Sequence, residues 1–376
     1  MVKIIAIIGI ILFIVMFSIV LVDIYVNMGT WLSRIKIGRW DDEKIWKEHV
    51  LTIAKKWFVH IPTVKKTDQT RYLLLDMIRG NYKNKTIQSW QIGGLYLGIG
   101  KNANEEELQS MQSAFIEQNS GKWIVSPKEV DEALLAYAIL KYSPNKDKIK
   151  PAMDEMFQLI KEKVQNNDQC VCYRNGISDV RFVDTIGFIC PFLALYGNFY
   201  QEQEAFSIVE CQIRNYQERG LLEKAFLPVH AYDSKSGLPM GIYGWGRGAG
   251  WWMLGLIDSY KEWQVDWLEE ILRQTAESIA CFENETGGFS SNLVLKNNVD
   301  SSITAIAGYF YQEYYKISDE KKYQDISQRC VNALMKNTRR TGEIDFSQGD
   351  TKGIGIYSQT YDRMPFTQGI TLQIGE

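Results

Sequence analysis

The chain has 376 residues, of which 45% are apolar and 23% are charged, and its formal net charge is −3 at pH 7. This composition is ordinary for a globular protein and excludes a disordered chain, a collagen-like chain and a small disulfide-stapled domain. The slight acidic excess argues against general binding to phosphates, so we expect no nucleic-acid partner. The 3 His are not close in sequence, and we expect neither a metal site nor a cofactor. The 11 Trp, 20 Tyr and 16 Phe exceed what a core alone requires, and sugar-binding clefts commonly use such a surplus.

The amino-terminal run Ile4–Val22 is uncharged and contains no Pro. As a helix it would span about 28 Å, which is close to the hydrocarbon thickness of a bilayer. A cleaved signal peptide usually has an apolar core of about 7–15 residues and then a small-residue cleavage site, and Asp23–Met28 offers no such site. We therefore predict a single-pass membrane anchor over residues 1–28 and a globular domain over residues 29–376. A cleaved signal peptide or a buried helix is the alternative.

The side of the membrane on which this domain lies stays open. Lys3 precedes the apolar run, whereas Arg34, Lys36 and Arg39 follow it, and this distribution favours a cytoplasmic domain by a small margin. The 6 Cys include no Cys-x-x-Cys pair, and their apolar surroundings suggest buried free thiols. Free thiols favour a reducing compartment only weakly.

Helical periodicity dominates the rest of the chain. Residues 154–164, 206–213 and 267–279 have the spacing of amphipathic helices. Short alternating segments at residues 288–294 and 353–358 predict one or two small hairpins. The fold class expected from these patterns is all-α.

A looser repeat organises these helices. Six times, a loop rich in polar residues or Gly precedes a mainly apolar helix; the six segments begin at Ser89, Ser126, Phe182, Gly244, Asp300 and Pro365. Their period of about 55 residues fits one helical hairpin with a loop and predicts a helical array or toroid. The last segment is apolar and does not form a polar cap, which favours a closed (α/α)6 barrel over an open solenoid. In such a barrel the residues that enter each inner helix converge on one rim, where we expect a cleft.

Two acidic residues stand near the starts of these apolar helices, Asp131 and Asp184. Taken singly, each fits a carboxylate at a helix N-terminus, where free amides and the helix dipole stabilise it. Taken together at one rim, they fit a pair of carboxyls that disturb each other's ionisation. Glycoside chemistry commonly uses such a pair, with a carboxyl of raised pKa as the proton donor and then the base.

The segment Trp245–Trp252 reads WGRGAGWW. Its glycines let the backbone approach a bulky group, and Arg247 offers a planar fork for a carboxylate. Trp251 offers a flat face for a sugar ring, and we include Trp245 and His230 among the candidate substrate-binding residues. The alternatives are tight helix packing with Arg247 in a structural ion pair, and a purely structural role for the lone His230. No strand is visible before the glycines, so a nucleotide-binding loop is not supported.

These segments resemble the unsaturated glucuronyl and rhamnogalacturonyl hydrolases of glycoside hydrolase families 88 and 105. The family pattern V-D-(D/T)-x-x-x-x-x-P-x-L-A is matched from Val183 to Ala194, with its Asp at Asp184. Asp131 matches a second Asp of the preceding inner helix, although the residues that follow it depart from the pattern. His230 precedes a match to W-(A/G)-R-G-N-G-W in which Ala249 replaces Asn. The resemblance covers residues 40–376.

The resemblance implies an (α/α)6 barrel that removes a 4,5-unsaturated uronic acid from the non-reducing end of an acidic oligosaccharide without a metal. The residue matching Asp184 would protonate the vinyl-ether double bond and take a proton from the water that adds at carbon 5. Asp131 would assist by position and charge, His230 and Arg247 would contact the substrate, and Trp251 would stack on a ring.

Residues 352–369 also resemble members found among exopolysaccharide-biosynthesis genes, so an anchored member would edit a polymer during its production. Two alternatives remain open at this point. One is another chemistry on the same toroid, such as inverting hydrolysis or epimerisation. The other is a glycan-binding component of exopolysaccharide biosynthesis that lacks turnover.

Overall fold

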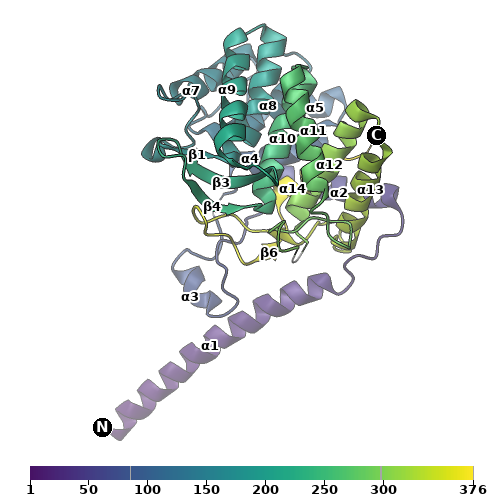
Figure 1. The fold of residues 1–376 in the computed structure, drawn as a ribbon. Helices are drawn as coiled ribbons and strands as arrows, with labels where there is room; N and C mark the ends of the chain where they lie inside the picture. Colours follow the sequence, from purple (N-terminus) through teal and green to yellow (C-terminus); the bar gives the residue numbers. More distant parts are fainter. Residues whose placement is uncertain (85, 297–298, 376) are drawn as a thin grey trace.

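The computed structural model describes residues 1–84, 86–296 and 299–375. Its centre is a ring of parallel inner helices: α4 (Ser89–Gly100), α6 (Ala133–Tyr142), α8 (Val183–Tyr200), α10 (Gly246–Glu262), α12 (Ser301–Ser318) and α14 (Pro365–Thr371). Each inner helix contacts the next, and α14 contacts α4, so the ring is closed (Figure 1). The six helices follow the six predicted segments, and the predicted (α/α)6 barrel is confirmed.

A second set of helices surrounds this ring: α2 (Glu43–Val59), α5 (Glu105–Ser113), α7 (Lys150–Glu162), α9 (Gln203–Arg219), α11 (Asp266–Ala280) and α13 (Lys321–Lys336). They are amphipathic and bury one face, whereas the inner helices are apolar on nearly every side and are buried almost completely. This contrast follows from the two-layer arrangement, because an inner helix meets protein in all directions. The three predicted amphipathic segments lie in α7, α9 and α11.

Glycines close the ring between its first and last inner helices. A Cβ at Gly98 would overlap the carbonyl oxygen of Gly369, and a Cβ at Gly94 would lie 2.8 Å from the Cα of Phe366. The backbones of α4 and α14 therefore touch without side chains between them. This close approach fits the predicted use of small residues on the inner helices.

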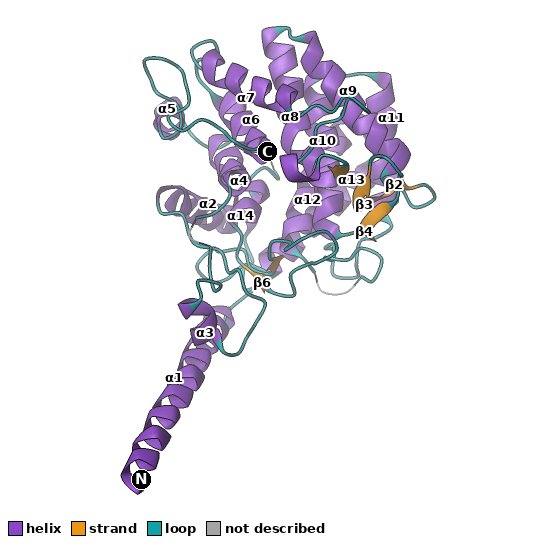
Figure 2. Ribbon diagram, turned by 90° about the vertical axis from the view of Figure 1, so that its left-hand side faces the viewer, coloured by secondary structure: helices purple, strands orange, loops and turns teal. Residues whose placement is uncertain are grey.

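The strands lie where the inner helices begin. The antiparallel strands β1 (Val180–Phe182), β3 (Leu227–Asp233) and β2 (Leu221–Leu222) pair in that order, and β4 (Pro239–Tyr243) pairs with β3. A separate pair joins β5 (Ser347–Gln348) to β6 (Tyr361–Asp362). Figure 2 shows β3, β4 and β6 at the end of the barrel from which the amino-terminal helix departs.

The two predicted hairpins were placed wrongly. The described residues of 288–294 and 353–358 make isolated bridges, such as Ser290 with Val299 and Gly353 with Ile356, and no ladder. The Asn292 side chain accepts hydrogen bonds from the amides of Val294 and Leu295, at 3.1 and 3.2 Å, and turns the chain before pairing can continue. The alternation of apolar and polar residues in segment 288–294 comes from loop residues that pack on the barrel, since Phe289 and Leu293 are buried.

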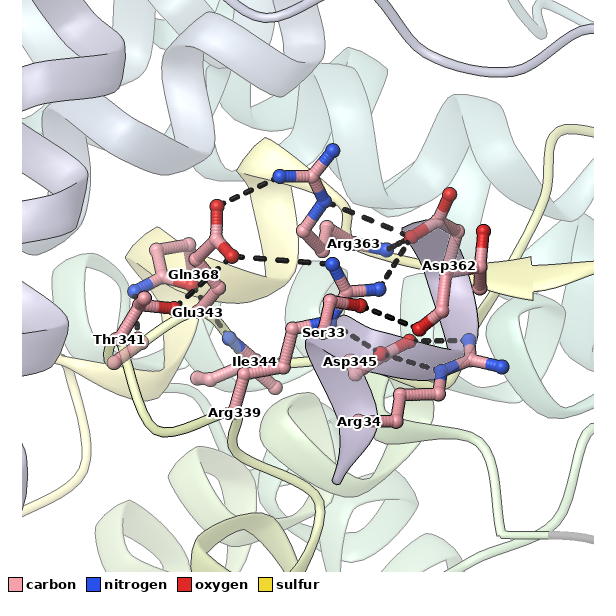
Figure 3. A network of polar contacts seen from close by, with 12 residues as sticks. Ser33, Arg34, Arg339, Thr341, Glu343, Ile344, Asp345, Asp362, Arg363 and Gln368 are labelled. Carbon is pink, nitrogen blue, oxygen red and sulfur yellow. Dashed lines mark hydrogen bonds and ion pairs between the residues drawn. The ribbon is translucent and has the colours of Figure 1, made fainter. Parts of the chain in front are cut away.

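Helix α1 (Val2–Arg34) projects from the barrel, and in the described part of the chain it is the one helix long and apolar enough to cross a membrane. Its C-terminal end is bound to the barrel through Arg34. The Nε and one terminal nitrogen of Arg34 donate to Asp345 at 2.8 and 2.7 Å (Figure 3). Asp345 also accepts from Nε of Arg339 at 2.6 Å. The boundary expected after residue 28 lies inside this continuous helix.

Replacing Gly98 with Ala is expected to destabilise the barrel by about 1–3 kcal/mol, because the added methyl group forces α4 and α14 apart. Thermal and denaturant unfolding of the full chain measure this change. Gly176→Ala is the matched control, since no heavy atom lies within 4 Å of a Cβ at that position. Equal stability of the two variants would contradict the closure of the ring by backbone contact.

Candidate active site

A cavity of about 430 Å³ opens at the end of the barrel where the inner helices begin. Five of the six predicted site residues line it: Asp184, His230, Trp245, Arg247 and Trp251. The sixth, Asp131, lies behind this wall and contacts two residues that do line the cavity. The tertiary fold therefore brings together residues that are far apart in the sequence.

Strand β1 leads directly into helix α8, and Asp184 is the second residue of this helix. Phe182 is the N-cap of this helix and makes no side-chain capping bond. The Asp184 side chain is 15% exposed, and its Oδ2 has no hydrogen-bond partner among the described residues. Burial raises the pKa of this carboxyl to about 7, although the positive charge of Arg247 opposes the shift. At neutral pH the group is therefore divided between its acid and its carboxylate form.

His230 is brought beside Asp184 by strand pairing, since Phe182 of β1 lies opposite Ala231 of β3. The register of β3 with β4 shifts between Val229 and Ala231, and such a bulge re-aims the side chain at its centre. His230 Nε2 lies 3.8 Å from Asp184 Oδ2, and its Nδ1 has no hydrogen-bond partner among the described residues. Burial lowers the pKa of His230 to about 4, and Arg247 adds to the effect. The ring is therefore neutral at neutral pH.

Arg247 is buried at the start of α10 and is bonded to the end of β5 and to the first residue after this strand. Its two terminal nitrogens donate to the carbonyl oxygens of Gln348 and Gly349, at 2.6 and 2.9 Å. One of them also lies 4.0 Å from Oδ1 of Asp350. Two of the five N–H groups of the guanidinium thus hold this segment, and the others are left for the carboxylate of Asp350 or for a ligand.

Asp350 is a cavity residue that the sequence reasoning missed. Its Oδ1 is buried without a hydrogen-bond partner among the described residues, and burial raises the pKa of its carboxyl, against the opposing charge of Arg247. Its position in a polar, glycine-containing loop just before the last inner helix was the available signal. Nothing in the sequence indicated that this loop folds back over Arg247.

Asp131 accepts a hydrogen bond from the hydroxyl of Tyr173 at 3.1 Å and pairs with Arg174 at 2.9 Å. Tyr173 and Arg174 line the cavity, and both were missed because they follow the Cys170–Cys172 segment in a loop without periodicity. Asp131 also raises the pKa of Asp184 as a minor cause. Asp131 therefore acts on Asp184 from behind the cavity wall, whereas the predicted mutual pairing of the two carboxyls stays a prediction.

Aromatic rings form the floor of the cavity. The Trp251 ring lies 4.6 Å from that of Phe188, 4.9 Å from that of Phe366 and 5.5 Å from that of Trp90. Trp245 donates from Nε1 to the side chain of Gln348 at 3.0 Å. Both predicted tryptophans are 1% exposed, so little of either ring faces the cavity, and the predicted stacking of a sugar on Trp251 stays a prediction.

The glycines around Arg247 serve helix packing. A Cβ at Gly248 would lie 3.2 Å from Val183, and one at Gly250 would lie 2.5 Å from Ile306. The predicted alternative of tight packing therefore describes these glycines. Arg247 bonds to two backbone carbonyls and lies 4.0 Å from the carboxylate of Asp350, so both its predicted structural role and its predicted substrate contact stay predictions.

A larger cavity of about 990 Å³ lies at the opposite end of the barrel, among α2, α12 and α13. It contains none of the predicted site residues, and its acidic and aromatic lining residues, Glu43, Glu48 and Tyr315, lie far from the starts of the inner helices.

The model of glycosyl hydrolase family 88 matches residues 67–375. No curated protein matches the chain in a sequence comparison.

Solved structures with similar folds include a possible member of family 105 from Salmonella enterica serovar Paratyphi A, with a TM-score of 0.72 and 14% identity over 89% of this chain and 92% of that one. Another is the unsaturated glucuronyl hydrolase of Bacillus sp. GL1, described as responsible for the degradation of glycosaminoglycan. It has a TM-score of 0.66 and 14% identity, and the match covers 88% of this chain and 95% of that one. A family 105 glycoside hydrolase from C. acetobutylicum has a TM-score of 0.64 and 16% identity over 80% and 96%. These likenesses show a shared fold. With the match of the family model over most of its length, the chain belongs to glycosyl hydrolase family 88 and is a glycoside hydrolase.

Proposed function

We propose that this protein removes a 4,5-unsaturated uronic acid from the non-reducing end of an acidic glycan. The observation that carries the proposal is the carboxyl of Asp184, which has a pKa of about 7 and an oxygen without a hydrogen-bond partner in the described part of the chain, in a cavity lined by aromatic and cationic residues. A general acid works best when its pKa lies near the operating pH. The resemblance of the residues around Asp184 to the unsaturated uronyl hydrolases supports the same role.

In the proposed reaction the acid form of Asp184 gives its proton to carbon 4 of the double bond. Water adds its oxygen to carbon 5 and returns a proton to the Asp184 carboxylate, which restores the acid. The product is a hemiketal at carbon 5, and its ring opens to a ketone by breaking the bond from carbon 5 to the ring oxygen. The hemiacetal left at carbon 1 then expels the remaining glycan as an alcohol.

A neutral His230 suits this reaction. An imidazolium 3.8 Å from Asp184 would hold the carboxyl in its charged form and remove the proton that the reaction needs. A neutral ring instead offers a hydrogen bond to the substrate or to the adding water without this effect. Asp131, held by Tyr173 and Arg174, contributes negative charge that favours the acid form of Asp184.

The cavity also suits an acidic sugar at the end of a chain. Arg174, Arg247 and Lys352 place three cations in its wall. Its volume of about 430 Å³ lies at the small end of the range for ligand pockets, and Trp90 and Trp251 line its inner part. A terminal residue therefore fits better than the interior of a polymer.

We further propose that α1 is retained as a single-pass anchor and that the substrate is processed at a membrane. Its residues from Val2 to Phe17 are all exposed, and no described part of the barrel covers this apolar surface. A role in editing an exopolysaccharide during its synthesis fits an anchored enzyme better than the uptake of free oligosaccharides does. The side of the membrane stays open.

Asp184→Asn is expected to lower turnover by at least about 10²–10⁴-fold while leaving the melting temperature nearly unchanged, because the exchange keeps the shape and removes the transferable proton. The assay follows the loss of ultraviolet absorbance of the double bond in oligosaccharides generated by a polysaccharide lyase. Asp179→Asn, at an exposed neighbouring carboxylate that pairs with Lys235, is the control.

A wild-type protein that binds the intact polymer but consumes no unsaturated end would instead favour the non-catalytic, glycan-binding alternative. An active Asp184→Asn variant would remove Asp184 from the reaction.

The rate is expected to fall as the pH rises through about 7. The donor proton is present below the pKa of Asp184 and is lost above it, so the rate should decline by about tenfold per pH unit on the alkaline side. His230, with a pKa of about 4, adds no transition near neutrality. Tryptophan fluorescence over the same pH range separates titration of the site from unfolding, and a flat profile from a folded protein would contradict the assignment of the acid.

Arg247→Lys is expected to weaken binding of acidic substrates by about 1–3 kcal/mol, because an ammonium group cannot reproduce a planar, charge-assisted pair of hydrogen bonds. It should also lower the melting temperature, since the bonds to the carbonyls of Gln348 and Gly349 are lost. Measurement of KM and of thermal unfolding separates the two effects, and the exposed Arg214→Lys is the control. A lower melting temperature with unchanged KM would make Arg247 a structural residue only.

A further inference from the structure

The segment from residue 60 to residue 84, here called the collar, leaves α2, contains the short helix α3 (Leu73–Ile78) and lies beside α1 (Figure 1). The carboxylate of Asp23 accepts hydrogen bonds from the amides of Tyr72 and Leu73, at 2.7 and 2.8 Å. The side-chain amide of Asn27 donates to the carbonyl oxygen of Thr70 at 3.0 Å. Because Asp23 directly follows the apolar run that ends at Val22, these bonds hold the collar at the level where that run ends.

The acidic residues of the collar are turned toward the protein. Asp68 pairs with Lys352 and accepts from the hydroxyl of Ser358 at 2.6 Å. Asp76 is buried and accepts from the hydroxyl of Thr67 at 2.7 Å.

Four of the five Lys and Arg side chains of the collar are exposed; the fifth, Lys65, is half-buried and donates to the carbonyl oxygen of Gln69 at 3.1 Å. Lys66, Arg71, Arg79 and Lys83 are exposed, and none has an ion-pair partner within 4 Å in the described part of the chain. This separation of charge leaves a positive outer surface although the whole chain has a net charge of −3.

Exposed apolar side chains accompany these cations, both in the collar and in the last turns of α1. Tyr72 and Ile78 of the collar are 54% and 74% exposed. On the last turns of α1, an exposed apolar stripe continues beyond the span, with Tyr25 at 81% and Trp31 at 64% exposed. Aromatic rings and cations of this kind are typical of the headgroup region of a bilayer.

We propose that the collar, together with the apolar stripe of α1, is a docking surface for a bilayer that contains anionic lipids. The occupant follows from continuity with α1, which brings the collar to the end of the apolar run, and from the unpaired cations. The inference rests on the proposed function in taking α1 as a membrane anchor.

Docking of the collar on the bilayer sets the position of the cavity relative to the membrane surface. Asp68 joins the collar to Lys352, which lines the cavity, and the hydroxyl of Thr360 in the same loop also donates to Asp68 at 3.3 Å. The cavity is thereby held close to the membrane surface. Its substrate is then an acidic glycan whose unsaturated end lies near the bilayer.

The test uses the full chain in nanodiscs of phosphatidylcholine, with or without phosphatidylglycerol. An environment-sensitive fluorophore is attached to Ile78→Cys in a Cys281→Ser background, since Cys281 is an exposed native thiol. Lys148→Cys, in the exposed connection between α6 and α7 at the other end of the barrel, carries the control label. Labelling of the background protein corrects for the half-buried Cys211, and thermal unfolding verifies each variant.

The fluorescence emission of the label at position 78 is expected to shift to shorter wavelength and to be quenched by lipids with spin-labelled headgroups. Both effects should be stronger in the anionic discs. Arg71→Glu with Arg79→Glu should abolish the difference between the two lipids, since each lost cation weakens the contact about fivefold. The control pair Lys122→Glu with Lys148→Glu, at exposed positions away from the collar, should preserve it.

A label at position 78 that is as water-exposed as the label at position 148, in protein that remains with the discs, overturns the docking surface and leaves the anchor intact. Equal quenching in both lipids overturns the role of the cations. Protein that does not remain with the discs overturns the anchor and the collar together. None of these readouts depends on turnover, so each is independent of the proposed reaction.

Discussion

The contact between α4 and α14 is the constraint on which the rest of the structure depends. These helices are the first and last of the inner ring, and Gly94, Gly98 and Gly369 let their backbones touch. Once they meet, six apolar helices enclose one core, and the starts of all six lie at one rim. The loops that precede these helices therefore all lie at this rim and surround a shared opening. The cavity is therefore a consequence of closure, and its residues come from loops and helix starts that are far apart in the chain.

The chemistry of the site comes from burying groups that lack a full set of partners. Among the residues that the structure describes, the buried polar atoms without a hydrogen-bond partner include Oδ2 of Asp184, Nδ1 of His230 and Oδ1 of Asp350, and all three residues line one cavity. Burial raises the pKa of Asp184 and lowers that of His230, and both shifts act in favour of the neutral form of the side chain. Unsatisfied buried polar groups are destabilising. Their convergence in one place indicates that the large apolar core of the barrel sustains a site arranged for a ligand.

One loop connects the site with the amino-terminal helix. Asp345 at its start is fully buried and binds both Arg34 and Arg339, and these hydrogen bonds hold the pKa of Asp345 below its usual value although burial opposes them (Figure 3). A few residues later, the carbonyls of Gln348 and Gly349 hold Arg247 in the cavity wall. The same segment thus receives the end of α1 and orients a residue of the site.

The sequence by itself determined the apolar run of α1, the six inner helices and the two segments around Asp184 and Trp245, because these depend on local composition and spacing. It also indicated closure, through a last segment that was too apolar to cap an open array. It did not determine the strands, since β1 and β2 are too short to show alternation and gain their stability from pairing with β3. Nor did it reveal Tyr173, Arg174 and Asp350, which lie in loops whose paths are fixed by the helices they cross.

The protonation of the site was decided by tertiary structure alone. From the sequence, Asp184 is an ordinary carboxylate at the start of a helix. In the fold, burial removes the water around it and raises its pKa, and burial lowers the pKa of His230 for the same reason. Their closeness depends on the register of β1 against β3, in which Phe182 lies opposite Ala231. Desolvation and strand register are properties of contacts between distant segments, and local sequence patterns do not contain them.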